Sequence, residues 1–148
     1  MISVEEALDR ILDRISPLGT ERLDLLSALG RVLAEPVVAH LNIPMWANSS
    51  MDGYAVRSQE TETATPERPA RLAIAGRIPA GSAAQRPLGP GEAIRIFTGA
   101  PLPSGADSVV PQEDVGVEGS ELAVPHPVSP GAFVRPVGED LRVGETVL

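Results

Sequence analysis

Glycine and proline are distributed very unevenly along this chain of 148 residues, and that distribution limits the folds available to it. Residues 1–35 contain three of them, whereas residues 36–148 contain 26. Both residues are unfavourable inside helices, so helices are expected mainly in the first part. The remainder is expected to form short strands joined by many turns, as in a small barrel or sandwich.

The first segment predicts one amphipathic helix. Ser3 and Glu6 form a capping-box pattern, in which the serine hydroxyl accepts a hydrogen bond from a backbone N–H of the first turn. The helix is expected to end before Pro17, because proline disfavours helical backbone at the residue before it. A second, shorter helix is predicted over 25–29, with Asp24 as its N-cap. The apolar residues at helical spacing in the first helix are Val4, Ala7, Leu8, Ile11, Leu12 and Ile15.

Several later runs have the composition of strands. A hairpin is predicted around Glu118-Gly119-Ser120, whereas residues 58–70 are polar and predict an exposed loop. The other predicted strands are residues 71–75, 92–98, 107–110 and 133–137. Together these patterns predict an α+β fold that is mainly β.

Composition excludes several kinds of chemistry. The chain has no cysteine, which rules out disulfides, thiolate metal sites and cysteine nucleophiles. Its net charge is −8, which makes nucleic acid or an anionic membrane surface a poor match as a partner. All 12 of its basic residues are arginine, so there is no lysine for a Schiff base or a phosphate-binding P-loop.

The N-terminus shows no signal-peptide pattern, and no run of residues is long and apolar enough to span a membrane. The expectation is therefore a soluble, cytoplasmic protein.

Residues 44–56 combine small polar groups with a single carboxylate. Asn48, Ser49 and Ser50 come shortly before Asp52, which is followed by glycine. An Asp-Gly pair is a common turn signal, so a purely structural turn is one interpretation. The other is that Asp52 serves as a Mg²⁺ ligand, since that ion takes one or two carboxylates together with water and phosphate oxygens.

A second segment, residues 95–107, begins as a strand and continues as a loop of glycine, proline and small residues. Backbone N–H groups in such a loop can approach an anion closely, and the Thr98 hydroxyl can add a donor. A surface loop shaped by its two prolines is the alternative. Glu113 follows the next apolar run and could face either a site or solvent.

The third segment, residues 135–144, contains Gly138-Glu139-Asp140. This pattern predicts a solvated turn, although the paired acids could hold a cation. The two histidines, His40 and His126, have no neighbouring ligands in the sequence and do not indicate a zinc site.

Taken in order, these segments resemble the N-terminal region of the MoeA family of molybdopterin molybdenumtransferases, which includes the E domain of gephyrin. The resemblance covers nearly all of the chain except residues 58–70 and parts of 80–90 and 115–130. The matching motifs are SVEEAL near the start, ALGRVLAEPVVA at 28–39, P-x-x-x-NSSMDGYAV at 44–56, G-x-AIRIFTGAPLPSGADSVV at 91–110 and VRPVGEDLRVG at 134–144.

The resemblance implies a function and a fold. Members insert molybdenum from molybdate into adenylylated molybdopterin and release AMP, with Mg²⁺ assisting. It implies a homodimer whose active site lies at the dimer interface. It also implies a first subdomain of helix and strand made of residues 1–49 plus 126–148, into which a β-rich, barrel-like subdomain of residues 50–125 is inserted.

The resemblance also assigns candidate residues. Asp52 and Thr98 fall on motif positions that imply catalytic roles, with Asp52 also a candidate Mg²⁺ ligand. Ser50, Gly99 and Glu113 are candidate substrate-binding residues. Whether molybdate or the diphosphate of the adenylylated pterin lies nearest Thr98 stays open.

Family members continue well beyond the last motif found here, into an α/β pterin-binding subdomain. The chain is therefore expected to be a fragment that is inactive alone. A non-catalytic dimerisation or scaffold module of the same fold is the alternative.

Overall fold

A computed structural model describes residues 2–148 and separates them into two units. The first unit ends at Val37, and the second spans Val38–Leu148. Within the described residues, no helix is both long and apolar enough to cross a membrane.

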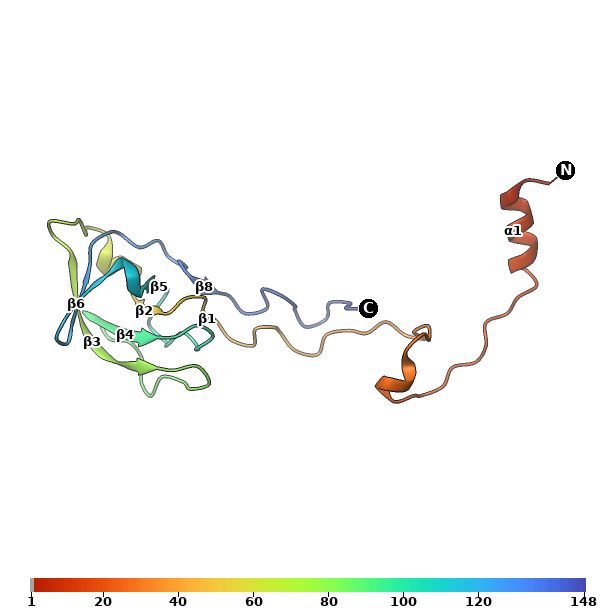
Figure 1. The fold of residues 1–148 in the computed structure, drawn as a ribbon, viewed down its shortest axis with the longest axis horizontal. Helices are drawn as coiled ribbons and strands as arrows, with labels where there is room; N and C mark the ends of the chain where they lie inside the picture. The colour runs from red at the N-terminus through yellow and green to blue at the C-terminus, as the bar shows by residue number, and fades with distance from the viewer. Residues whose placement is uncertain (1) are drawn as a thin grey trace. The chain divides into compact units, whose positions relative to one another are not determined.

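The first unit contains the predicted helix, α1 (Val4–Leu12), drawn in red in Figure 1. Ser3 caps it as expected, because its Oγ accepts a hydrogen bond from the Glu6 N–H at 3.1 Å. The second predicted helix is a short 3-10 helix, η1 (Leu25–Ala28), and Asp24 makes no side-chain capping bond there. None of the residues in either helix is buried.

The second unit is built on a curled sheet of six strands (Figure 1). Its spatial order is β5-β2-β4-β3-β7-β6, and only the β3–β4 pair is parallel. The strands are β2 (Gly53–Val56), β3 (Ala70–Ile78), β4 (Glu92–Ile96), β5 (Ser108–Pro111), β6 (Gly116–Glu118) and β7 (Glu121–Val124). One helix followed by a mainly β unit confirms the predicted fold class, and the β6–β7 hairpin is also confirmed.

Apolar side chains cover both faces of this sheet. Along β2, Tyr54 and Val56 join one buried cluster, whereas Ala55 between them joins the other. This alternation follows from the pleat, which points successive side chains to opposite faces. The first cluster also contains Leu72, Ala93, Val110, Leu122 and Val124, and the second contains Ile78, Leu88, Ile94, Ile96, Ala100 and Val109.

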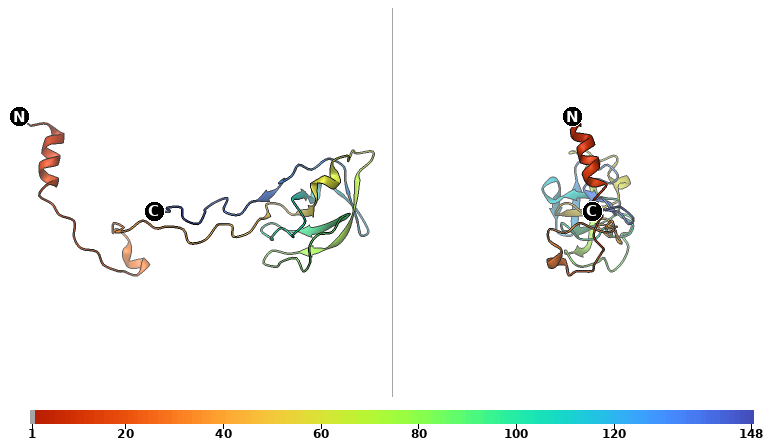
Figure 2. Two further views of the ribbon diagram at one scale, coloured as in Figure 1. Left: turned by 180° about the vertical axis from the view of Figure 1, so that it is seen from behind. Right: turned by 90° about the vertical axis from the view of Figure 1, so that its right-hand side faces the viewer.

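The two ends of the second unit run side by side as extended segments, as both figures show (Figures 1 and 2). Strand β1 (Asn48–Ser49) pairs with β8 (Val134–Arg135), and isolated bridges join Val38 to Thr146 and Ile43 to Leu141. A subdomain made from residues 1–49 plus 126–148, with 50–125 inserted, stays a prediction.

The prediction of an exposed loop over 58–70 is wrong in its first part. A 3-10 helix, η2 (Ser58–Thr61), begins there, and Ser58 and Thr61 are buried. Ser58 donates to the Asp107 carboxylate through its backbone N–H at 2.7 Å and its hydroxyl at 2.6 Å. Thr61 Oγ1 accepts from the Val128 N–H at 2.9 Å. The polar side chains are therefore internal hydrogen-bonding partners, which composition does not reveal.

Candidate functional site

Asp52 and Thr98 form a hydrogen-bonded pair. Asp52 directly precedes β2 and Thr98 lies two residues after β4, and the antiparallel pairing of Gly53 with Ile96 brings these strand ends together. Asp52 Oδ1 accepts from the Thr98 backbone N–H at 2.9 Å and from the Thr98 hydroxyl at 2.8 Å. The two motif residues that the sequence singled out separately are thus in direct contact.

Glycines shape the backbone on both sides of this pair. A side chain at Gly53 would overlap the carbonyl oxygen of Val110 on the neighbouring strand β5, so only glycine fits after Asp52. Gly99, after Thr98, has a φ of +81°, a conformation that other residues rarely adopt. Its N–H donates to the Ser49 carbonyl at 2.8 Å, which fixes the loop against β1.

The Asp52 carboxylate is held in its charged form. The hydrogen bond from the Thr98 backbone N–H, followed by the one from its hydroxyl, lowers the pKa of Asp52 below its ordinary value. The charge of Arg95 lowers this pKa further, but by less. Asp52 Oδ2 accepts no hydrogen bond from any side chain or backbone group of residues 2–148. One oxygen of an ionised carboxylate therefore remains available to a ligand.

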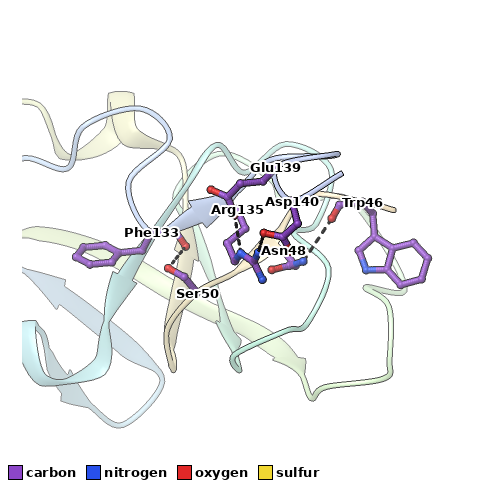
Figure 3. Close-up of polar contacts among 7 residues, drawn as sticks. All are labelled: Trp46, Asn48, Ser50, Phe133, Arg135, Glu139 and Asp140. Carbon is purple, nitrogen blue, oxygen red and sulfur yellow. Dashed lines mark hydrogen bonds and ion pairs between the residues drawn. The ribbon is translucent and has the colours of Figure 1, made fainter. Parts of the chain in front are cut away.

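Ser50 is oriented toward a different segment (Figure 3). Its hydroxyl and its backbone N–H both donate to the Phe133 carbonyl, each at 3.0 Å. Phe133 has a φ of +53°, which is uncommon for a residue other than glycine. These two bonds hold the strained turn before β8, so the contacts of Ser50 in this structure are structural.

Arg135 on β8 forms ion pairs with both acids of the Gly138-Glu139-Asp140 turn (Figure 3). Its Nε donates to Glu139 at 2.6 Å, and one terminal nitrogen donates to both oxygens of Asp140 at 2.6 and 2.7 Å. The hydrogen bond to Glu139, followed by that to Asp140, raises the pKa of Arg135. Strand pairing places Arg135 opposite Asn48 on β1, which connects the segments 44–56 and 135–144.

The described part of the chain shows no group of three or more histidine, aspartate or glutamate side chains that could hold a metal ion. The carboxylates of Glu139 and Asp140 are both ion-paired with Arg135. A cation at Asp52 would consequently rely on one carboxylate together with water and ligand oxygens, which is a coordination mode that Mg²⁺ uses.

Comparison with known proteins identifies the family. The sequence model that describes the MoeA N-terminal region (domain I and II) matches residues 2–148. This chain belongs to that family.

Curated relatives and solved structures agree with this membership. The chain is 41% identical over its full length to the molybdopterin molybdenumtransferase of Synechococcus elongatus, of which it covers 38%. It is 43% identical to molybdopterin molybdenumtransferase 2 of Mycobacterium tuberculosis and covers 36% of that protein. A crystal structure of the molybdopterin biosynthesis protein MoeA from Pyrococcus horikoshii superimposes with a TM-score of 0.91 at 40% identity, over 97% of this chain and 38% of that one.

Glu113 does not join the Asp52–Thr98 pair. It lies exposed on a 3-10 helix, η3 (Gln112–Asp114), and makes no hydrogen bond to either residue of the pair. It lines a cavity of about 710 Å³ whose walls include Val110 and His126. The connection to the pair is indirect, through the Gln112 N–H, which donates to the Asp52 carbonyl at 3.0 Å.

Arg135 is the residue of this region that the sequence did not assign. The Gly-Glu-Asp pattern predicted a solvated turn, and Glu139 and Asp140 are indeed exposed in a turn. The structure adds that both acids are paired with Arg135. The available signal was local: an arginine lies four and five residues before the two acids.

Proposed function

We propose that this chain forms one side of a site that inserts molybdenum from molybdate into adenylylated molybdopterin, with release of AMP. The observation that carries the proposal is the Asp52–Thr98 pair, which leaves one oxygen of an ionised carboxylate free. Relatives named molybdopterin molybdenumtransferase that match the whole chain support it. Because the chain covers only 38% of the Synechococcus relative, we expect it to be inactive alone.

Asp52 is the proposed catalytic residue and the proposed Mg²⁺ ligand. Its free Oδ2 suits an ion that takes few protein ligands and completes its coordination with water and phosphate oxygens. Bound Mg²⁺ would offset the negative charge of the substrates, which matters in a chain of net charge −8. Asp52 would then fix the position of that charge next to Thr98.

The main proposed role of Thr98 is to orient and charge the Asp52 carboxylate. Both of its donors are used by the Asp52 carboxylate, so they orient this group and keep it ionised. The Thr98 hydroxyl oxygen retains lone pairs that can accept from a substrate or contact the cation. Substrate contacts of Thr98, Ser50, Gly99 and Glu113 stay proposals.

A chimera tests the proposal. In this chimera, the chain replaces the matched 38% of the Synechococcus relative, and the rest of that relative supplies the residues that the chain lacks. Molybdenum insertion by the chimera can then be measured. Asp52→Asn should lower the rate by about 100-fold, because the substitution removes the charge. Asn Oδ1 can still accept from Thr98, so the thermal midpoint should change little. Asp114→Asn, which alters an exposed acid on η3, serves as the control.

Two outcomes would contradict the proposal. If the Asp52→Asn chimera inserts molybdenum at the parent rate, Asp52 has no catalytic role. If Asp52→Asn unfolds the second unit, the carboxylate serves the turn instead. The conservative Thr98→Ser variant keeps both donors to Asp52 and should retain most of the activity.

A dimerisation or scaffold module of the same fold is the second candidate. It is favoured by the exposed apolar side chains of α1, where Val4 is 80% exposed and Leu8 is 53% exposed. Sedimentation equilibrium of this chain would show a dimer that Leu8→Asp disrupts. Homodimerisation stays a prediction of the resemblance, and a cytoplasmic location stays an expectation from the sequence.

A further inference from the structure

Two arginines face each other on one side of the sheet. The parallel pairing of β3 with β4 places Arg77 opposite Arg95, and the pairing of β2 with β4 places Tyr54 opposite Arg95. Residues paired in this way project from the same face of a sheet. Three neighbouring strands therefore contribute one tyrosine and two cations to a single row.

Aromatic rings contact both guanidinium groups. The Cζ of Arg95 lies 5.1 Å from the centre of the Tyr54 ring and 4.8 Å from that of the Phe97 ring. The Cζ of Arg77 lies 4.7 Å from the centre of the same Phe97 ring. Ring faces attract cations, yet they neither neutralise the charge nor occupy an acceptor for every N–H. Phe97 thus holds two cations near one another.

Neither charge is paired with a carboxylate in residues 2–148. The ion pairs there involve other arginines: Arg10, Arg31, Arg57, Arg71, Arg86 and Arg135. Arg95 donates to the neutral oxygens of Gly53, at 3.0 Å, and Gln112. The Arg77 side chain makes no hydrogen bond to a described residue. Like charges on directly paired residues are destabilising, so this arrangement favours an added anion.

The arginine pair adjoins the candidate site. β4 ends at Ile96, Phe97 follows, and Thr98 then donates to Asp52. The charge of Arg95 is close enough to contribute to the lowered pKa of Asp52, after the two hydrogen bonds from Thr98. An anion on the arginine pair would therefore lie beside the carboxylate that we propose as the Mg²⁺ ligand.

We propose that Arg77 and Arg95 form a binding site for a diphosphate group, with each guanidinium binding one phosphate. Guanidinium groups match phosphate oxygens with paired N–H donors, and two of them suit a group that carries two linked phosphates. The identification of this group as the diphosphate of adenylylated molybdopterin rests on the proposed function. Binding of a diphosphate by the chain itself does not.

Calorimetric titration of this 148-residue chain with inorganic pyrophosphate at low ionic strength tests the site. Arg77→Gln should weaken binding by about ten-fold or more, because one of two charge-assisted contacts is lost. This variant should fold normally, since the Arg77 side chain is exposed and makes no hydrogen bond. Arg68→Gln removes the same charge from an exposed loop arginine without an ion pair and should bind as the parent does.

Three results would overturn the inference: no binding by the parent chain, unchanged binding by Arg77→Gln, or equal weakening by Arg68→Gln, which would indicate only general charge attraction. Arg77→Lys adds a sharper test. It keeps the charge but loses the planar fork, so its affinity should fall between the parent and Arg77→Gln.

The chimera separates this inference from the proposed function. Arg77→Gln should raise the KM for adenylylated molybdopterin and change kcat little. If pyrophosphate fails to bind while Asp52→Asn abolishes molybdenum insertion, the diphosphate site is wrong and the function stands. If pyrophosphate binding depends on Arg77 while Asp52→Asn inserts molybdenum normally, the site stands and the proposed function is wrong.

Discussion

The two units of this chain use their apolar residues in opposite ways. In the second unit, the apolar residues of β2 and β4 are buried, and Ala55 and Ile96 are fully inaccessible. In the first unit, α1 has a regular apolar stripe, yet none of its residues is buried. The same kind of pattern thus forms secondary structure in both units, but it builds a core in only one. Periodicity predicts which side of an element is apolar, and it does not identify what covers that side.

The largest expected effect comes from removing a core side chain. Ile96→Ala should destabilise the second unit by about 2–5 kcal/mol, because it leaves a cavity between the sheet and the residues that pack on it. Leu8→Ala in α1 should change the free energy of unfolding by less than about 0.5 kcal/mol, since Leu8 is already half exposed. Urea denaturation followed by circular dichroism measures both. An equal cost for the two substitutions would show that α1 is packed in solution.

The next largest loss of stability is expected where the backbones of β2 and β5 approach closely at Gly53. Gly53→Ala should destabilise the second unit by about 1–3 kcal/mol, because the new methyl group overlaps the Val110 carbonyl and must displace β5. Gly76→Ala on β3 is the matched control, since a side chain there meets nothing within 4 Å. Thermal denaturation compares them. Similar midpoints for both variants would mean that β2 and β5 separate at little cost.

Local signals explain what the sequence predicted well. Helix α1 follows from a capping box and a stripe of apolar residues, all within one short segment. The β6–β7 hairpin follows from a glycine-containing turn between two short runs. The motifs around Asp52 and Thr98 were recognised from their composition. Each of these depends on residues close together in the chain.

Long-range pairing accounts for what was missed. The parallel β3–β4 pairing places Arg77 beside Arg95, although neither segment carries a signal for the other. Ser58 became an internal partner of Asp107 across 49 positions, so a polar loop turned out to be partly buried. The contact of Asp52 with Thr98 likewise depends on the β2–β4 register. Contacts of this kind require the topology, which composition alone leaves open.

The stability of the second unit should also depend on pH through Glu92. The paired hydrogen bonds from Arg86, followed by the Gly89 N–H, lower the pKa of Glu92 from 4.5 to about 2. A carboxylate with a lowered pKa in the folded state stabilises it fully above the unfolded value of 4.5, and this contribution disappears as the pH falls toward 2. Glu92→Gln should therefore reduce the loss of stability between pH 5 and pH 2.

Urea midpoints measured at several pH values test this dependence. Glu67→Gln is the control, since Glu67 is exposed in a loop and makes no ion pair. If Glu92→Gln and the parent lose stability in parallel as the pH falls, the Arg86–Glu92 pair is not formed in solution.

The smallest effect concerns the first unit alone. Ser3→Ala removes the oxygen that accepts from the Glu6 N–H, and loss of such a cap typically costs a helix about 1 kcal/mol. A peptide of residues 2–18 should lose helicity, whereas the urea midpoint of the second unit in the whole chain should not change. Ser16→Ala, beyond the end of α1, should leave the helicity of the peptide unaltered.

Helix α1 buries none of its side chains, so within this chain it is stabilised by local interactions such as the Ser3 cap. Removing the cap tests whether the remaining local interactions are enough to keep the helix formed. If Ser3→Ala instead lowers the midpoint of the whole chain, the two units unfold together, and the contrast between them disappears.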